Sequence, residues 1–394
     1  MSGIDQTNKQ PAISKNVVIL GLVSLFNDFA SEMIYPIVPL FLTNVLAAPV
    51  MIVGLIEGLA ESTSCILKVF SGRLSDRLRK RKIFVFLGYC LSTSAKALIG
   101  LAYGWPLVLI ARFIDRFGKG VRTSARDAMI AESSQKEKRG LAFGYHRAMD
   151  TLGAVIGPLT AILLLALFKG EMRPIFFIAF IPGLIGVILL YFFVKEKYHQ
   201  PVAASLTKVS WKNLHPSYKF FLLVSLIFSL GNSSDAFLIL RAQNLGLTVM
   251  MTILAYVFYN FTYAVFSAPA GVISDRIGPR KVLISGFIIY TLVYFSFGVI
   301  NNSFWLWLLF PVYGCYMALT DGVGKAYIAN LTIVENSATI FGVYQTATGL
   351  ASFFASLVAG FLWQYIGVTS PFIFGGVMAL TAVLLLVFKR NNKS

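Results

Sequence analysis

Ionisable side chains recur inside long apolar stretches of this 394-residue sequence. The densest group falls on one helical face at intervals of three or four residues: Arg112, Arg116, Lys119, Thr123 and Arg126. An ionised group inside a membrane helix costs about 2.5–3.5 kcal/mol on insertion scales, so this basic stripe must face an aqueous cavity or partner acids. The sequence leaves three hypotheses open. The stripe is an anion-binding wall of arginine forks, a set of cations neutralised by Asp115 and by neighbouring acids, or a series of side chains that extend to the membrane surface.

A second polar face lies in the first apolar run, where Asp28, Glu32 and Tyr35 follow one another at helical spacing. Desolvation favours the neutral form of a carboxyl group, so Asp28 or Glu32 could bind a proton on one side of the membrane and release it on the other. The sequence therefore predicts proton coupling at these two acids. The alternative is a permanent ion pair with the basic stripe.

The second half of the chain offers fewer candidates. A polar, glycine-containing interruption runs from Gly231 to Asp235, and broken helices of this kind often line substrate sites. Asp321 and Lys325 form an i,i+4 pair. We expect Asp235 and Lys325 to contribute to a substrate site together with Tyr35 and the basic stripe; ordinary structural pairing is the alternative for Lys325.

Composition places these residues in a membrane protein. The chain is 57% hydrophobic and 13% charged, whereas soluble domains carry roughly 25% charged residues. Twelve apolar runs are long enough to cross a bilayer, and each is expected to be a helix because backbone in lipid must satisfy its own hydrogen bonds. They span 16–46, 51–72, 83–103, 105–131, 139–168, 173–194, 217–245, 248–274, 281–301, 303–330, 337–367 and 370–389.

Lys and Arg alternate between connections. They concentrate after the second, fourth, sixth, eighth and twelfth runs, and Lys169 and Arg173 are the main exceptions on the other side. The positive-inside rule then places both termini in the cytoplasm. The net charge of +17 is explained by these short connections and not by a nucleic-acid-binding face. The segments 1–15 and 390–394 are expected to be cytoplasmic tails, and 195–216 a cytoplasmic linker between helical bundles 16–194 and 217–389.

The chain repeats itself at half length. Gly72-Arg-Leu-Ser-Asp76-Arg77 recurs as Gly271-Val-Ile-Ser-Asp275-Arg276, and Phe143-Gly144 recurs as Phe341-Gly342, which gives a shift of about 199 residues in both cases. Internal repeats around a central binding site are typical of secondary transporters. The fold class predicted is an all-α integral membrane protein with two pseudo-symmetric six-helix bundles.

These motifs resemble those of the major facilitator superfamily, over essentially the whole chain. The segment from Gly72 to Arg81 is similar to the signature loop between the second and third helices, with its weaker copy after the eighth. Arg116-Phe-Gly-Lys119-Gly120 resembles the helix-four motif, with Lys119 in place of the usual Gln. Gly153-Ala-Val-Ile-Gly157-Pro158 is similar to the antiporter motif of helix five, and Pro36-Ile-Val-Pro39 to the paired prolines of bacterial drug-exporter-like members.

The resemblance implies a rocking mechanism with gating residues at the repeated motifs. Gly72, Asp76 and Arg77 in the first copy correspond to Asp275 and Arg276 in the second, and Gly153, Gly157 and Pro158 belong to the helix-five motif. The start of a helix offers unpaired N–H groups, so Asp76 could dock near Ser337 and Asp275 at the start of the fifth helix. A plain helix-ending acid beside its neighbouring Arg is the alternative.

The hypothesis for function is a proton-coupled permease that moves a small, anionic organic solute across the inner membrane by alternating access. The rival is efflux of drugs or lipophilic cations, which the helix-five motif and the acids of the first helix favour. We expect no enzyme, since GxSxG and HExxH motifs are absent, no metal or other cofactor, and no nucleic-acid partner. The expected partners are the solute, protons and the lipid bilayer, with the chain acting as a monomer.

The charge asymmetry of the connections makes a testable prediction about topology. In a variant without Cys65, Cys90 and Cys315, a cysteine placed at Ser2 or Ser394 is expected to resist a membrane-impermeant maleimide in intact cells and to react after lysis, because both termini are cytoplasmic. Labelling of either position from outside would contradict the orientation.

Overall fold

The computed structural model describes residues 13–78, 80–135, 139–196, 215–330 and 337–388, and within these ranges every regular element is a helix. The first half comprises α1 (Lys15–Ile34), α2 (Ile37–Leu40), a π-helical turn η1 (Phe41–Val45), α3 (Val50–Leu78), α4 (Arg81–Gly100), α5 (Trp105–Glu132), α6 (Arg139–Leu167) and α7 (Arg173–Phe193). The second comprises α8 (Pro216–Gly231), α9 (Ala236–Asn244), α10 (Val249–Ile277), α11 (Pro279–Val299), a 3-10 turn η4 (Ser303–Trp305), α12 (Leu306–Asn330), α13 (Ser337–Tyr365) and α14 (Ser370–Phe388). The prediction of an all-helical chain is confirmed.

Each of the twelve predicted runs coincides with one helix or with a broken one. Two runs are interrupted in the structure: α1, α2 and η1 follow one another around Pro36, and α8 and α9 are separated by the polar residues 232–235. The largest difference in bounds is at α3, which continues to Leu78 although the predicted run ended at residue 72. An α-helix can continue outside the apolar region of the membrane, so α3 extends beyond its apolar residues into a basic segment.

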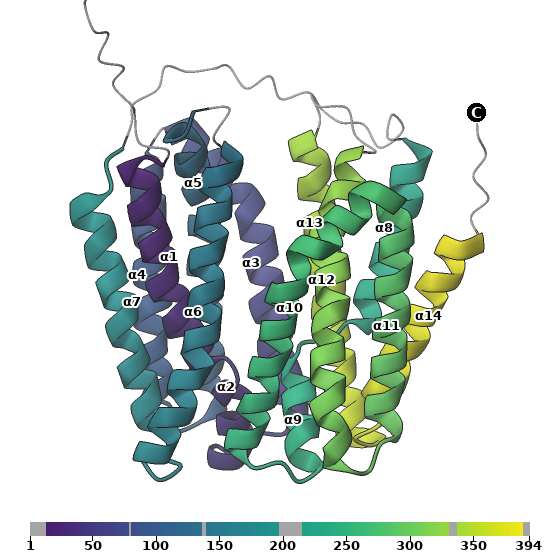
Figure 1. Ribbon diagram of the computed structural model, residues 1–394. Helices are drawn as coiled ribbons and strands as arrows, with labels where there is room; N and C mark the ends of the chain where they lie inside the picture. The colour runs from purple at the N-terminus through teal and green to yellow at the C-terminus, as the bar shows by residue number, and fades with distance from the viewer. Residues whose placement is uncertain (1–12, 79, 136–138, 197–214, 331–336, 389–394) are drawn as a thin grey trace, which may run out of the picture.

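The helices stand side by side, with the start of α1 and the end of α14 at the same end of the molecule, uppermost in Figure 1. We call this the basic end, because the Lys- and Arg-rich connections, such as those between α3 and α4 and between α10 and α11, also lie there. The other is the opposite end. Helices α1–α7 lie on one side of Figure 1, and α8–α14 on the other.

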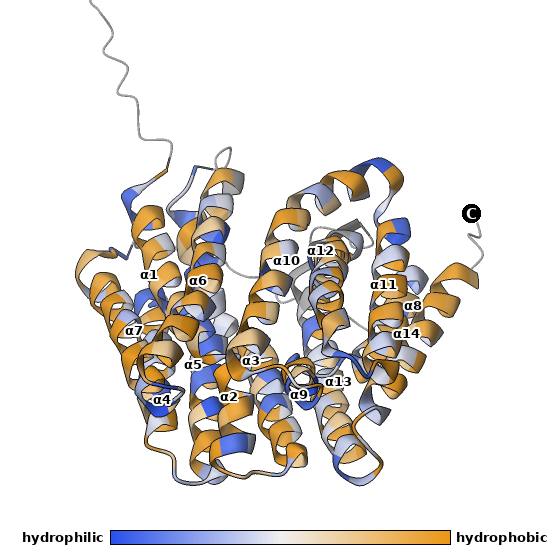
Figure 2. Cartoon of the chain, turned by 60° about the horizontal axis from the view of Figure 1, so that its bottom comes forward, coloured by the Kyte–Doolittle hydropathy of each residue, from blue (hydrophilic) through white to orange (hydrophobic). Residues whose placement is uncertain are grey.

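Eleven spans within the described residues are long and apolar enough to cross a membrane. The remaining predicted run, α5, is 28 residues long, but because it carries the basic stripe it is not apolar enough to be one of these spans. It packs between α3 and α4, and Figure 2 shows several hydrophilic stretches along it. The twelfth helix is thus present at the predicted place, and it is polar because its neighbours shield it from lipid.

Glycines allow α6 to lie directly against α1. An added Cβ at Gly153 would be 2.7 Å from the carbonyl oxygen of Leu25, and one at Gly157 would be 2.8 Å from the backbone nitrogen of Met33. Small residues are the usual means by which helices approach closely in membranes, where hydrophobic exclusion does not drive them together. The motif that predicted a gating role therefore has an observed role in packing.

Glycines also allow the two halves of the chain to pack closely where α3 contacts α13. A Cβ at Gly54 would be 2.3 Å from the carbonyl oxygen of Ser356, and one at Gly360 would be 2.9 Å from the Cα of Met51. Farther along, a Cβ at Gly349 would be 2.5 Å from the Cβ of Cys65. We call this contact the α3–α13 seam. It begins at the opposite end and reaches about half-way along both helices.

The α1–α6 contact predicts unequal effects of two alanine substitutions in α6. Gly157→Ala places a methyl group against the α1 backbone, and overpacking of this kind costs about 1–3 kcal/mol, so the melting temperature of purified protein should fall. Gly144→Ala is the matched control, since its Cβ would meet nothing within 4 Å. Equal melting temperatures for the two variants would contradict the close approach.

Candidate functional site

The basic stripe of α5 is partly neutralised inside the first half. Arg112 donates hydrogen bonds from Nε and Nη2 to Glu57 of α3 at 2.7–3.1 Å, and both side chains are at most 6% exposed. The guanidinium of Arg112 also lies over the ring of Tyr35, 5.8 Å from its centroid. Glu57 and Arg112 therefore form a buried pair whose members depend on each other, and the alternative hypothesis of neutralisation holds for this end of the stripe.

Arg116, one turn farther, is held less completely. Its Nε lies 3.9 Å from Asp115, which is also 3.7 Å from Arg112. The Arg116 side chain is 11% exposed, and among the described residues its buried Nε has no hydrogen-bond partner. Asp115 therefore lies beside two arginines of the stripe. A guanidinium N–H without an acceptor is costly when buried, so Arg116 is suited to receive one from a ligand.

Lys119 and Arg126 continue the stripe towards the basic end. Lys119 is half-buried and interacts electrostatically with Arg116, Glu61 and Asp28. Arg126 pairs with Asp127 at 3.0 Å and donates a hydrogen bond to the Ser24 hydroxyl of α1 at 3.1 Å. Only the middle of the stripe, at Arg116 and Lys119, combines strong positive charge with incomplete pairing.

The predicted coupling acids of α1 reach towards the second half. Glu32 accepts a hydrogen bond from the Tyr256 hydroxyl of α10 at 3.1 Å, and the ring of Tyr35 stacks on that of Tyr256 with centroids 5.6 Å apart. Asp28 is half-buried and accepts a hydrogen bond from the side chain of Asn27 at 3.3 Å. Neither acid forms a described ion pair with the stripe, so the alternative of a permanent pair has no support at these positions.

Asp235 lies among tyrosines at the break between α8 and α9. Its carboxylate accepts hydrogen bonds from Tyr259 at 3.1 Å and from Tyr313 at 2.7 Å. The Tyr259 ring is 5.5 Å from that of Tyr256, so aromatic contacts connect Asp235 to Tyr35 in the first half. The polar interruption thus brings a carboxylate into the aromatic cluster that extends to Tyr35, over which Arg112 lies.

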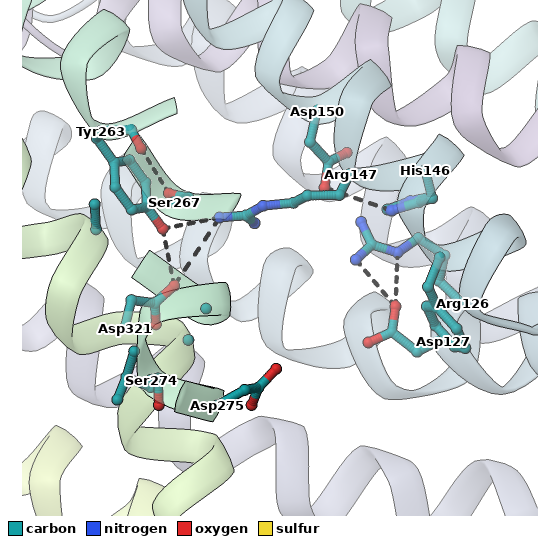
Figure 3. Close-up of a pocket in the computed structure, with 15 residues that line it drawn as sticks. Arg126, Asp127, His146, Arg147, Asp150, Tyr263, Ser267, Ser274, Asp275 and Asp321 are labelled. Carbon is teal, nitrogen blue, oxygen red and sulfur yellow. Dashed lines mark hydrogen bonds and ion pairs between the residues drawn. The ribbon is translucent and has the colours of Figure 1, made fainter. Parts of the chain in front are cut away.

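A cavity of about 480 Å³ opens between the two halves towards the basic end. Arg126, His146, Arg147 and Asp150 line it from the first half, and Tyr263 and Asp321 from the second (Figure 3). Arg147 crosses it, with Nη2 3.0 Å from the Tyr263 hydroxyl and 4.0 Å from Asp321. The polar lining of both halves therefore meets in one water-accessible space.

Comparison with known proteins agrees with this architecture. The family model of the Major Facilitator Superfamily matches residues 20–240 and 220–394. The chain belongs to the Major Facilitator Superfamily. An uncharacterised MFS-type transporter of Methanocaldococcus jannaschii is 42% identical over 383 residues, with 95% of each chain covered. The multidrug resistance protein MdtG of Citrobacter koseri is 27% identical over 345 residues, 83% of this chain and 82% of its own.

A solved nucleoside transporter, NupG, in a mutant form, has the same fold with a TM-score of 0.79 and 13% identity, covering 95% of this chain and all of its own. The chain is therefore a multi-pass membrane protein and a transporter of the superfamily. Its relatives in the family and its structural neighbours are transporters and not enzymes.

The structure describes most, but not all, side chains of the superfamily's repeated loop motif. Gly72 lies against Ser124 of α5, where a Cβ would be 3.1 Å from the serine Cβ, and Arg77, Asp275 and Arg276 are exposed. Asp275 also lines the cavity. The side chains of Asp76 and Lys325 lie outside the described part of the chain, so docking at Ser337 and the Asp321–Lys325 pair stay predictions. Pro158 lies within α6 directly after Gly157.

Sequence reasoning did not predict several polar contacts of the site. Tyr256, Tyr259 and Tyr263 of α10 all donate hydrogen bonds to acids: Glu32, Asp235 and Asp321. His146 was not singled out, although it stands one helical turn from Asp150. That spacing was the available signal. The pairing of Glu57 with Arg112 joins residues 55 positions apart, and no local pattern announces it.

The Glu57–Arg112 pair predicts a large loss of stability on Glu57→Gln. Removing one member of a buried pair leaves an uncompensated charge and typically costs about 3–5 kcal/mol. Glu171→Gln is the control, an exposed acid in the connection between α6 and α7. Thermal unfolding of the purified variants should show a clear decrease for Glu57→Gln and little change for Glu171→Gln; the reverse order would contradict the pairing.

Proposed function

We propose that this protein is a proton-coupled secondary transporter that moves a small organic anion across the inner membrane by alternating access. It acts as a monomer whose bundles, 16–194 and 217–389, rock about their interface, with both termini in the cytoplasm. Arg116 and Lys119 bind the anion, flanked by Arg112, Arg126 and Tyr35. Asp235 and Lys325 contribute from the second half, and Asp28 and Glu32 carry the proton.

The observation that carries this proposal is the incomplete pairing of Arg116. Its neighbour Arg112 is satisfied by Glu57 at 2.7 Å, whereas the Nε of Arg116 is buried among the described residues without an acceptor. Buried charge persists only where something compensates it. Asp115 and Glu61 supply nearby negative charge, but neither supplies an acceptor for this N–H. A carboxylate or phosphate ligand supplies the missing acceptor, and a planar guanidinium binds it through two hydrogen bonds.

Proton coupling is supported by the positions of Asp28 and Glu32. Both are partly buried, and Glu32 is bound to Tyr256 of the opposite half. A carboxyl group at the interface of two halves that move relative to each other changes its surroundings during transport, which is the condition for binding a proton in one state and releasing it in the other.

A second candidate function is efflux of lipophilic cations. It is favoured by the Asp235 carboxylate with its ring of tyrosines, since aromatic faces and a buried acid attract organic cations, and by the name of the relative MdtG. The two candidates make opposite predictions about which ligands stabilise the purified protein.

A thermal-shift screen therefore tests the proposal. Mono-, di- and tricarboxylic acids and organic phosphates form one panel, and tetraphenylphosphonium and cationic dyes form the other. We expect a ligand from the anion panel to raise the melting temperature by mass action. Stabilisation only by cations would replace the anion proposal with the efflux one.

The role of Arg116 is tested with the stabilising anion. Arg116→Ala should lose binding by a hundredfold or more, since the loss of one partner of a buried charge pair costs about 3–5 kcal/mol, and Arg116→Lys should rescue it only in part because an ammonium cannot form the fork. Lys281→Ala, an exposed residue near the start of α11, is the control for loss of positive charge. A folded Arg116→Ala variant that still binds the anion would remove Arg116 from the site.

A further inference from the structure

His146 and Asp150 form a polar pair on α6 that the proposed function does not use. They stand one turn apart, 3.5 Å from Nδ1 to Oδ2, with side chains 5% and 14% exposed. Both line the cavity at the basic end (Figure 3). A carboxyl group that is mostly buried and yet touches a water-accessible space can exchange protons with that space.

The Asp150 carboxylate is poorly satisfied for a buried group. Among the described residues its Oδ1 has no hydrogen-bond partner, and the 3.5 Å contact of Oδ2 with His146 is at the limit of a hydrogen bond. Besides His146, the Ser24 hydroxyl is the hydrogen-bond donor that interacts with Asp150, so an ionised carboxylate here has few donors to stabilise its charge. Its protonated form needs fewer of them, so the site is built to bind a proton.

His146 connects this carboxyl group to a hydrogen-bond chain. Its Nε2 lies 2.7 Å from the Ser24 hydroxyl, which accepts from Arg126 at 3.1 Å and lies 3.1 Å from the Tyr89 hydroxyl. Neutral histidine has one N–H and one acceptor nitrogen. Two arrangements satisfy the chain.

In the first arrangement Asp150 is ionised and faces the Nδ1–H of His146. Ser24 then donates to Nε2, and Tyr89 donates to Ser24. In the second, Asp150 is protonated and donates to a bare Nδ1, while the Nε2–H donates to Ser24 and Ser24 donates to Tyr89. A proton arriving at Asp150 is therefore accommodated by reversing the donors of the chain, with no change of net charge on His146.

The acids of α1 and α6 follow one line towards the cavity. Glu32 and Asp28 are one turn apart on α1, about 6 Å along the axis. The Cβ of Asp28 adjoins Gly153, which stands three residues beyond Asp150 on α6. Asp28 also interacts electrostatically with Asp150. The line thus runs from the contact between the halves at Glu32, past Asp28, to the cavity at Asp150.

Charged and titratable groups of every neighbouring helix face this position. In the first half they are Asp28 of α1, Tyr89 of α4, Arg126 and Asp127 of α5, and Arg147 of α6. Across the cavity they are Tyr263 and Asp275 of α10 and Asp321 of α12. The two arginines favour ionised Asp150 and Asp28 opposes it, so the protonation of the site responds to the charge state of α1.

We propose that the Asp150 carboxyl group, positioned by His146, is the proton-binding site that exchanges the coupled proton between the α1 acids and the cavity. The step forms an O–H bond on Asp150 as an O–H bond breaks on the protonated Asp28 carboxyl group, which leaves a carboxylate, or on hydronium in the cavity, which leaves water. This inference rests on the proposed proton coupling and adds to it the end of the path at which the proton meets solvent.

Infrared spectroscopy of the purified full-length protein tests this without knowledge of the transported solute, since a protonated carboxyl group has a C=O stretch separate from that of a carboxylate. In a titration from about pH 4, where ordinary carboxyl groups titrate, to about pH 9, the wild type should show an aspartic-acid band that persists towards neutral pH. Aspartate labelled with ¹³C in its carboxyl group should shift that band.

Variants at three positions identify the source of the band. In Asp150→Glu, which keeps the charge, the band should no longer respond to the aspartate label. Asp150→Asn should lack the band altogether, and Asp127→Asn, which removes a more exposed acid of the same cavity, should retain it. His146→Gln should keep the band but move its midpoint, which a merely structural role of His146 would not do.

Other results would distinguish failure of the Asp150 site from failure of the proposed proton coupling. A band that persists with its label response in Asp150→Glu but disappears in Asp28→Asn or Glu32→Gln overturns the Asp150 site and leaves proton coupling at α1 in place. Absence of any such band in the wild type overturns both. An unchanged midpoint in His146→Gln overturns the positioning role of the histidine.

Discussion

The cost of an ionised side chain inside a membrane is the constraint on which the arrangement of this protein depends. α5 carries its cations through the depth of the bundle, and it is tolerated there because α3 and α4 cover it and Glu57 holds Arg112 with both oxygens. The same shielding explains how α5 can be less apolar than the membrane-spanning helices around it. Charge is thus retained where neighbouring helices can neutralise it or leave it facing the cavity.

Close helix packing is the second requirement, since a buried pair is only as rigid as the helices that hold it. Glycines bring α6 onto α1 at Gly153 and Gly157, next to the acids Asp28 and Glu32. Between the halves, the glycines of the α3–α13 seam do the same. The polar residues described above therefore lie on helices fixed by backbone contact and not by long side chains, which gives the acids and arginines defined neighbours.

The helices could be predicted from the sequence because hydropathy over some twenty residues is a strong local signal. Their bounds differ most at α3, where a helix continues beyond its apolar part. The partners of the candidate residues could not be predicted in the same way. Spacing placed Arg112 and Arg116 on one face, but only the packing of α3 distinguishes a satisfied arginine from its unsatisfied neighbour. The hydrogen bonds of the α10 tyrosines could not be predicted either, because lipid-facing and acid-binding aromatic residues look alike in sequence.

The α3–α13 seam has a mechanical consequence. It holds two helices in backbone contact from the opposite end to about their mid-points, and the cavity occupies the space towards the basic end. When two helices are held together over one part of their length, a change in the angle between them displaces their free parts in proportion to the distance from the seam. In a helix rising 1.5 Å per residue, a tilt of about 10° displaces a point about 20 Å from the joint by about 3.5 Å. Such a shift is comparable to the length of a hydrogen bond, so a small change of angle is enough to separate Arg147 from Tyr263. The glycines of the α3–α13 seam hardly move in the same change.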